Sequence, residues 1–589
     1  MESAFLVSIL EWAAQFQPFA LIPPAIMYFL AALIVLWSSH RVGRVVMFAM
    51  PFLTVFQLVV MVAVQPNVTL ALLDMSLVIL RVDALSLLFA LLFNIAALIG
   101  VIYAMHVRDR LQSVSAMCYV GSALGAVYAG DLLTLFIFWE LLALSSVGFI
   151  WARRQPESMG AGMRYLLVQV VSGLLLLAGA LYLYGQTGSL LFNHIGLDGP
   201  AGWLILIAFG IKCGFPLLHG WITEAYPAAT EAGAVFMAAI TTKVAVYALA
   251  RGFQGEELLV YIGVTMTCFP IFYAVIENDL RRVLAYSMIN QLGFMVCGIG
   301  VGTTLAVNGA VAHAFNDVIF KGLLFMSMGA VLMQTGRING SELGGLYRTM
   351  PKTTVLCIVG AMSISAFPLL SGFVSKAMIV TAVLEEHYEW VWLALLFASA
   401  GVFHHAGIKI PYFAFFAHDS GLRPSEPPTN VLIAMSIAAV LCIGIGIYPT
   451  LLYQMLPFDM EYTPYDATHV LAQLQLLWFS ALAFVWLNLR GWYPPELPSV
   501  NLDVDWIYRK AVPRSTAALL PHLSKIGERS ALYIGDGFHR IGVLVARGLV
   551  TMVGQTTSIR LMAIYLLTVL MLYLLLDALI VLLLSLIHI

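Results

Sequence analysis

Charged residues are scarce in this chain of 589 residues. Lys and Arg together number 29 and Asp and Glu 31, so only 10% of the residues are charged, against about 25% in an ordinary soluble domain. The formal net charge is −2, which argues against a nucleic-acid partner because phosphate binding needs a basic surface. The composition therefore excludes a typical soluble domain and a nucleic-acid-binding protein.

Cysteine is also scarce, and its pattern excludes several kinds of site. The six cysteines lie singly in apolar runs, at positions 118, 213, 268, 297, 357 and 442. Without a CxxC pair, the sequence argues against iron–sulfur ligation, structural zinc and a disulfide framework. We expect these thiols to pack as small apolar side chains.

Cofactor motifs are missing as well. The sequence contains no Walker loop, no HExxH and no pair of residues suited to haem ligation. A GxGxG string at 298–302 lies inside an apolar run with no strand before it, so it does not indicate a dinucleotide site. We predict no cofactor, no metal site and no redox site of the chain's own.

Long apolar runs dominate what is present, since 61% of the residues are hydrophobic. Runs of about 20 apolar residues cross the ~30 Å hydrocarbon layer as helices. The sequence therefore predicts an all-α polytopic membrane protein with about 16 transmembrane helices. The expected spans are 19–39, 44–64, 82–104, 112–129, 131–151, 160–186, 201–222, 229–251, 258–276, 283–304, 305–335, 353–386, 391–417, 430–453, 470–490 and 559–583.

Basic residues alternate from loop to loop and predict the orientation. One set of loops carries Arg and Lys, at positions 41, 44, 108, 110, 153, 154, 164, 281, 282, 337, 348, 352 and 423, whereas the intervening loops are often acidic. Positive loops stay in the cytoplasm, so the N-terminus is expected outside. The start lacks a basic region with a small-residue cleavage site, and we expect the first span to direct insertion.

Six regions follow from this pattern. We predict N-terminal transmembrane helices (1–111), a first helix repeat (112–251), a second helix repeat (258–417), C-terminal transmembrane helices (430–490), an interfacial connector (491–558) and a final transmembrane helix (559–583). A soluble subdomain is the alternative for the connector, which is too polar to cross a bilayer. The last six residues, 584–589, resemble a translated sequencing adaptor, and we assign them no function.

One stretch combines a buried charge with a helix break. In residues 208–221, Lys212 is placed near the middle of an apolar span and is followed by Gly214 and Pro216. A proline inside a helix removes a backbone hydrogen bond, and such a break in a membrane survives only within protein or beside a water-filled cavity. A charge and a break at mid-membrane are typical of an ion or proton pathway.

The same pattern recurs about 150 residues later. Residues 215–221, FPLLHGW, are echoed by 367–373, FPLLSGF, with a second break at Pro368 and Gly372. A second echo, QTG, occurs at 186–188 and 334–336. About five spans fill the offset, and an odd number reverses the second copy in the membrane. We therefore predict two inverted five-helix repeats, each containing a broken helix.

Ionisable residues recur within the apolar spans. His313, Asp317 and Lys321 are spaced by four and share one helical face. A structural ion pair or a snorkelling end explains any single member, and Lys409 in particular could snorkel to the interface. As a set they are too costly to be retained for packing alone. The predicted proton-relay residues are Glu140, Lys212, Lys243, His313, Asp317, Lys321, Lys376 and Lys409.

Several of these segments together resemble a known family. The residues are 82–86, 131–146, 210–212 with 216–221, 226–229, 284–287, 313–321 and 370–376. They are similar to the antiporter-like membrane subunits of respiratory complex I, membrane hydrogenases and Mrp-type cation/proton antiporters. The resemblance implies that Glu140 and Lys212 form a carboxylate–lysine pair. It also implies that Lys243 and the helix of His313 and Lys321 form a central relay, and that Lys376 is the exit or coupling group.

Two branches of this family remain open. Residues 407–416 look most like the D-type subunits of Mrp antiporters, which implies a membrane subunit for Na+ or K+/proton exchange, whereas 491–583 resemble the longer distal subunit of complex I. The family works only in hetero-oligomers, so other membrane subunits are the expected partners, in a bacterial-type inner membrane. A scaffold or a solute carrier is the alternative from another class, but its breaks would need aromatic and hydrogen-bonding side chains rather than Leu, Pro and Gly.

Overall fold

The computed structural model describes residues 8, 10–72, 75–498, 501–511 and 514–515. The chain divides into two compact units, Met1–Asn501 and Leu502–Ile589. The described part of the second unit contains the short helical segment η5 (Ile507–Ala511). The predicted final span at 559–583 and most of the predicted connector at 491–558 lie outside the described residues.

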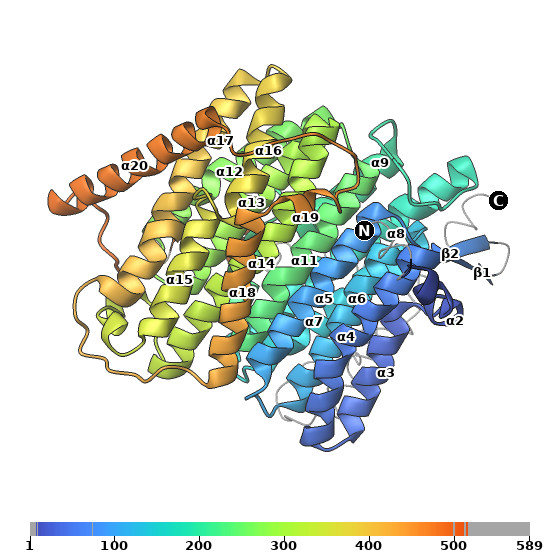
Figure 1. Cartoon of the computed structure of the whole chain (residues 1–589), viewed down its shortest axis with the longest axis horizontal. Coiled ribbons are helices and arrows are strands. Elements are labelled where there is room, and N and C mark those ends of the chain that lie inside the picture. Colours follow the sequence, from blue (N-terminus) through green and yellow to red (C-terminus); the bar gives the residue numbers. More distant parts are fainter. Residues whose placement is uncertain (1–7, 9, 73–74, 499–500, 512–513, 516–589) are drawn as a thin grey trace, which may run out of the picture. The chain divides into compact units, whose positions relative to one another are not determined.

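The first unit is a bundle of long helices packed side by side (Figure 1). Its N-terminal helices are α2 (Gln17–Ala20), α3 (Pro24–Trp37), α4 (His40–Val64) and α5 (Ala84–Ala104). A first set follows, α6 (Arg110–Tyr128), α7 (Leu132–Trp151), α8 (Pro156–Thr187), α9 (Pro200–Cys213), α10 (Gly220–Ala228) and α11 (Glu231–Gly252). A second set is α12 (Glu257–Ile276), α13 (Leu280–Val301), α14 (Thr304–Thr335), α15 (Pro351–Ile364), α16 (Ser371–Glu385), α17 (Glu389–Val402) and the π-helical segments η3 (Phe403–Lys409) and η4 (Tyr412–Phe416). The bundle ends with α18 (Thr429–Ile447), α19 (Thr450–Tyr453) and α20 (Ala467–Leu489), and two 3-10 turns, η1 (Gly340–Glu342) and η2 (Leu346–Arg348), lie between α14 and α15.

The helices have the length and apolarity that membrane crossing needs. Among the described residues, 11 helices are long and apolar enough to span a bilayer, and α3, α9 and α15 are shorter apolar helices. Each expected span from 19–39 to 470–490 coincides with one helix, with two successive helices or, for 391–417, with α17 and the two π-helical segments that continue it. The prediction of a helical multi-pass membrane protein is confirmed.

One element was not predicted, a β-hairpin between the second and third spans. Its strands, β1 (Asn67–Leu72) and β2 (Met75–Arg81), pair antiparallel with Asn67 opposite Arg81. The segment is rich in β-branched residues, which favour strands, and is too short to cross the membrane as a helix.

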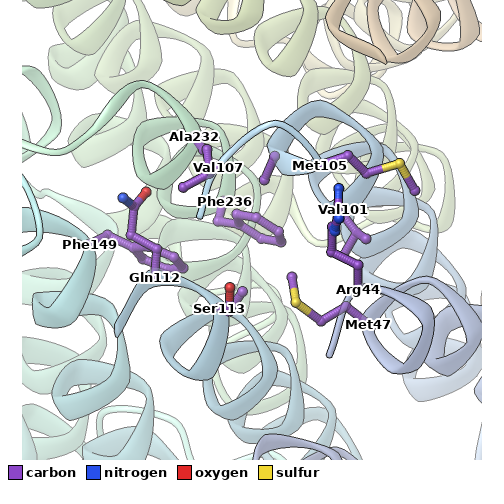
Figure 2. A pocket seen from close by; sticks show the side chains of 12 residues that line it. Arg44, Met47, Val101, Met105, Val107, Gln112, Ser113, Phe149, Ala232 and Phe236 are labelled. Carbon is purple, nitrogen blue, oxygen red and sulfur yellow. The ribbon is translucent and has the colours of Figure 1, made fainter. Parts of the chain in front are cut away.

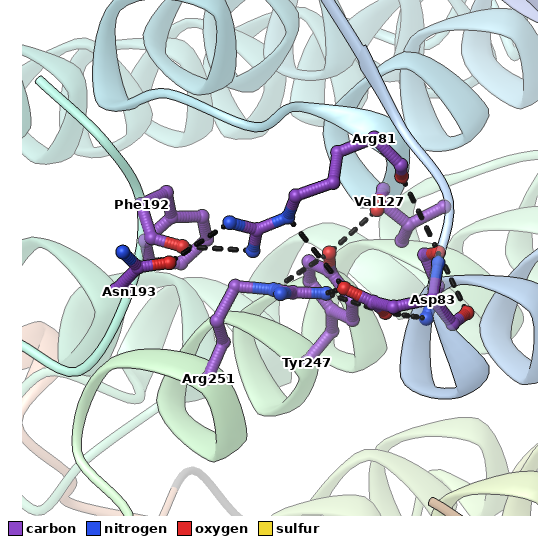
Figure 3. A network of polar contacts seen from close by, with 8 residues as sticks. Arg81, Asp83, Val127, Phe192, Asn193, Tyr247 and Arg251 are labelled. Carbon is purple, nitrogen blue, oxygen red and sulfur yellow. Dashed lines mark hydrogen bonds and ion pairs between the residues drawn. The ribbon is translucent and has the colours of Figure 1, made fainter. Parts of the chain in front are cut away.

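A polar network joins the end of this hairpin to α5 and α11 (Figure 3). Asp83 caps α5 and lies 2.8 Å from Arg251 Nη2, while Arg81 donates to the Phe192 carbonyl at 2.8 Å. Arg251 also donates to the Tyr247 hydroxyl at 2.9 Å, and Tyr247 in turn donates to the Val127 carbonyl at 2.5 Å. These bonds fix the hairpin and the start of α5 to the first helix set.

The two helix sets match element by element. Helices α8 and α14 both have 32 residues and both end at a glycine with positive φ, Gly188 and Gly336. Asp131 caps α7 and Asp279 caps α13, each with its side chain. Each aspartate also forms an isolated β-bridge, to Leu191 and to Asn339 respectively. The sequence repeat thus has a counterpart in element order and capping, whereas its inversion in the membrane stays a prediction.

Both sets contain a helix that stops and restarts, at 214–219 and at 365–370. The Phe215 amide donates to the Gly210 carbonyl at 2.9 Å, and the Phe367 amide donates to the Met362 carbonyl at 3.1 Å, 152 residues later. The leucine that follows each proline, Leu217 and Leu369, has φ of 69° in both breaks.

Glycines permit the two breaks for different reasons. Gly214 ends α9 with φ of 80°, a conformation that side chains disfavour. Gly372 lies in the first turn of α16, where a Cβ would clash with the Ser363 carbonyl. Pro216 and Pro368 lie within the two interruptions.

Candidate functional site

All eight predicted relay residues are buried inside the bundle. The most exposed of them is Glu140, with 8% of its surface accessible. Buried charges are costly unless they have hydrogen-bond or ion-pair partners. The partners of each residue therefore define what the site can do.

The first buried pair lies beside the first helix break. Lys212 is the penultimate residue of α9, and its ammonium donates to the Trp139 carbonyl at 3.0 Å and lies 4.5 Å from the centre of the Trp139 ring. Glu140 follows Trp139 on α7 and interacts electrostatically with Lys212. Its carboxylate fills the space that a side chain at Gly173 of α8 would occupy. The structure thus brings together the two residues that the resemblance paired.

The centre of the bundle contains a direct ion pair. Lys243 Nζ on α11 lies 2.5 Å from Asp317 Oδ2 on α14, and both side chains are fully buried. The ammonium also donates to the Ala238 carbonyl at 3.1 Å. Because both charges lack solvent, each depends on the other for compensation.

Helix α14 carries three predicted residues, which contact three different neighbours. Asp317 pairs with Lys243, whereas Lys321 donates to the Ser287 hydroxyl on α13 at 2.8 Å. His313 is hydrogen-bonded through Nδ1 to the Ser375 hydroxyl on α16, at 3.0 Å. Its Nε2 is bonded to Gln291 Oε1 on α13, at 3.1 Å. The three residues share one face of α14, as their spacing predicts, and this face contacts α11, α13 and α16.

Lys376 lies just past the second break, on the first turns of α16. Its ammonium donates to the Ile364 carbonyl at 3.2 Å and lies 4.9 Å from the centre of the Phe294 ring. Ile364 is the last residue of α15, so its carbonyl has no amide of its own helix four residues ahead. The second break thus supplies a backbone acceptor for the buried lysine.

The alternative that Lys409 snorkels to the interface is wrong. Its side chain is fully buried, and the ammonium lies 2.9 Å from Glu496 Oε1. It also donates to the carbonyls of Val275 and Glu277 at the end of α12, at 2.7 and 2.6 Å. Partners inside the protein replace the water that a snorkelling lysine would reach.

Four polar residues at the site were missed by the sequence analysis. Ser287 and Gln291 hold Lys321 and His313, His405 lies four residues before Lys409, and Glu496 pairs with Lys409. The four-residue spacing of His405 and Lys409, one helical turn, could have marked His405. Glu496 lies after α20 in a polar segment, and nothing in its local sequence marks it as buried.

A small cavity opens elsewhere in the bundle (Figure 2). It measures about 20 Å³, space for about one water molecule. Its lining residues come from α4, α5, α6, α7 and α11 and include Arg44, Gln112 and Phe236. None of the predicted relay residues is among those that line it.

Comparison with known proteins places this arrangement in a family. The profile described as NADH:quinone oxidoreductase/Mrp antiporter, TM matches residues 129–403. The D subunit of the Na(+)/H(+) antiporter of Alkalihalophilus pseudofirmus is 28% identical over 368 residues, 58% of this chain and 73% of that protein. The N subunit of the NADH-quinone oxidoreductase of Desulforudis audaxviator is 32% identical over 354 residues, 55% of this chain and 70% of that protein. The A subunit of the same Alkalihalophilus antiporter is 30% identical, and the chain spans 52% of its length.

Solved structures share the fold. A chain of the Mrp complex from Dietzia sp. aligns with a TM-score of 0.68 and 21% identity, covering 79% of this chain and 98% of that one. A chain of the archaeal membrane-bound sulfane sulfur reductase aligns with the same TM-score and 20% identity, covering 91% of this chain. With the relatives above and the buried lysines at the two helix breaks, these matches identify the chain as a member of the NADH:quinone oxidoreductase/Mrp antiporter transmembrane family.

Proposed function

We propose that this chain is the proton-translocating membrane subunit of a multisubunit antiporter that exchanges Na+ or K+ for protons. The observation that carries the proposal is the fully buried Lys243–Asp317 pair, which joins the two helix sets at 2.5 Å. Ionisable groups inside a membrane bundle are costly and mark ion or proton pathways. The relatives named as D and A subunits of a Na(+)/H(+) antiporter support the choice of reaction.

In this proposal the buried residues pass protons between the two sets. A desolvated lysine gives up its proton more readily than a solvated one, and a nearby carboxylate reverses that effect. Glu140 and Lys212 form the first coupled pair, and Lys243, Asp317, His313 and Lys321 form the central relay. Lys376 and Lys409 connect the relay to the far side. The breaks at Gly214, Pro216, Pro368 and Gly372 let the backbone beside Lys212 and Lys376 move.

The partners follow from the same reasoning. Sequence relatives of this chain are named as subunits, and the solved neighbours belong to membrane complexes. We infer that this chain likewise works within a hetero-oligomer in a bacterial cytoplasmic membrane, with its N-terminus outside.

A second function is favoured by one observation, the 32% identity to an N subunit of NADH-quinone oxidoreductase. In that case the same relay would pump protons in a complex I-like or hydrogenase complex, driven by redox chemistry in a partner protein. The cation would then play no part.

The test uses inverted membrane vesicles that hold the whole assembled complex. An imposed proton gradient should collapse on addition of Na+ or K+, and Lys212→Ala should abolish the response at equal amounts of assembled complex. The opposite result would be a proton gradient that does not change on addition of Na+ or K+ but forms when an electron donor and a quinone are supplied. That result would contradict the antiporter and support the redox-driven pump.

A further inference from the structure

The segment that follows α20 packs back onto the second helix set. Tyr493 lies in this segment, and its ring is stacked 6.0 Å from that of Phe413 and lies 5.4 Å from that of His404. This packing brings Glu496 to Lys409, with 2.9 Å between Oε1 and Nζ. The two side chains are 5% and 0% exposed. A carboxylate from outside the transmembrane helices is thus the ion-pair partner of a lysine within them.

The Lys409 ammonium is fully satisfied in this arrangement. Its three N–H donors match three acceptors, which are Glu496 and the carbonyls of Val275 and Glu277. Burial raises the pKa of the Glu496 carboxyl, while the Lys409 charge lowers it and the Glu277 charge raises it. The net effect on the pKa is upward, so Glu496 takes up a proton at higher pH than an exposed glutamate does, although the Lys409 charge opposes this.

The other charged groups at this end are held in fixed contacts. Glu277 Oε1 accepts the amides of Asn278 and Asp279 at 2.9 and 3.2 Å. Its Oε2 accepts Asn501 Nδ2 at 3.2 Å and lies 3.7 Å from Arg282 Nη1. Glu277 is thus held by these four partners, whereas the partner of Glu496 among the described residues is Lys409.

His405 lies four residues before Lys409. It is fully buried on η3, and its Nε2 has no hydrogen-bond partner within the part of the chain that the structure describes. It is close enough to Lys321 and to Lys409 for electrostatic interaction with both. The backbone here is π-helical from Phe403 to Lys409, a local distortion that is frequent at functional sites.

We propose that Glu496, Lys409 and His405 form a branch that exchanges protons between Lys321 and the aqueous side at the ends of α12 and α20. This inference rests on the proposed function and adds two residues, Glu496 and His405, that it does not include. When a proton moves from the aqueous side to Lys321, the carboxylic acid of Glu496 first gives its O–H proton to the neutral amine of Lys409. This step leaves the ion pair that the structure shows. The ammonium then passes a proton to the imidazole of His405, and the imidazolium passes one to the neutral amine of Lys321.

The charge rule places this end of the bundle in the cytoplasm, because Arg281 and Arg282 lie in the first turn of α13 and Arg423 lies in the loop before α18. The segment 491–498 is then a cytoplasmic cover that supplies the terminal carboxylate. Glu496 lies after α20 and outside both helix sets. The segment that follows α20 therefore controls the access of protons to Lys409 although it belongs to neither repeat.

The test separates a relay from a structural ion pair. Lys409→Met combined with Glu496→Gln removes both charges, so no buried charge is stranded, and a purely structural pair should tolerate the change. We expect the double variant to assemble normally while cation-driven proton exchange falls at least about tenfold, because no titratable group remains at either position. Glu496→Gln alone should show the same loss, since the amide still offers Lys409 an acceptor but carries no transferable proton.

Two controls accompany these variants in the assembled complex. Glu342→Gln removes an exposed carboxylate from η1 and should leave exchange unchanged. Lys212→Ala reports on the proposed function itself. If Lys212→Ala abolishes exchange while the double variant exchanges at the wild-type rate, the branch is wrong and the relay stands. If the Lys212→Ala variant exchanges protons normally, the proposed function itself is contradicted, and the branch that rests on it is contradicted as well.

Discussion

Lys243 Nζ lies 2.5 Å from Asp317 Oδ2, and neither side chain has any exposed surface. Lys243 belongs to the first helix set and Asp317 to the second, so this pair is an electrostatic link between them. Lys321, one turn after Asp317, turns to Ser287 and away from that pair. The buried charged residues thus extend from Lys243 on α11, in the first set, to Asp317 and Lys321 on α14, in the second set.

Asp317→Asn should destabilise the assembled protein. The change leaves the Lys243 ammonium buried beside a neutral amide and the Ala238 carbonyl, without an opposite charge, and breaking a buried ion pair costs about 3–5 kcal/mol. Thermal unfolding of the purified complex should show the loss. Lys243→Met combined with Asp317→Asn removes both charges and should recover most of the stability while exchange stays absent. A single Asp317→Asn variant as stable as the wild type would show that the pair contributes little to the fold.

Lys212→Arg should stop proton exchange although it keeps the positive charge. Arginine does not release its proton in a protein, so the positive charge at the Trp139 carbonyl and ring would stay in place without being passed on. Lys212→Ala and Glu140→Gln should stop exchange as well while the complex still assembles. Exchange is measured across pH at matched amounts of assembled complex. Wild-type rates in Lys212→Arg would mean that Lys212 carries no proton.

Gly173→Ala should impair exchange by displacing the Glu140 carboxylate. A Cβ at this position overlaps Glu140 Oε1, and overpacking of this kind costs about 1–3 kcal/mol. The matched control is Gly185→Ala on the same helix, where a Cβ meets no atom within 4 Å. The control should keep wild-type exchange and gain slightly in stability, because alanine is the better helix former by about 1 kcal/mol. Equal exchange by the two variants would show that the position of Glu140 is unimportant.

The orientation can be tested with single cysteines in a background that lacks the six native ones. Gln155 and Glu385 are both exposed in the structure, at the start of α8 and at the end of α16. If positive loops stay inside, Gln155→Cys should react with an impermeant thiol reagent from the cytoplasmic side and Glu385→Cys from the outer side. Arg281 is a poor labelling position because it is buried, with its guanidinium on the carbonyls of Tyr226 and Ala229. Labelling of 155 and 385 from the same side would contradict both the orientation and the inverted repeat.

The breaks at 214–219 and 365–370 could be predicted because proline and glycine act on the local backbone. Pro216 and Pro368 cannot donate within a helix, and Gly214 permits the positive φ that ends α9. The hairpin at 67–81 was missed because it is a short, largely apolar segment between two predicted spans. Period and composition alone do not separate a short apolar strand from a short apolar helix.

The sequence by itself determined that this chain crosses the membrane repeatedly, where its helices break, and which buried lysines and carboxylates have to find partners. These properties depend on apolar length, backbone chemistry and the cost of an unpaired charge, all of which are local. Only the tertiary structure decided the partners: Asp317 for Lys243, Ser287 for Lys321, and Glu496 for Lys409. The reason is that a partner is chosen by packing between helices far apart in the chain. In the case of Glu496, a segment outside every span folds back to meet a lysine 87 positions earlier.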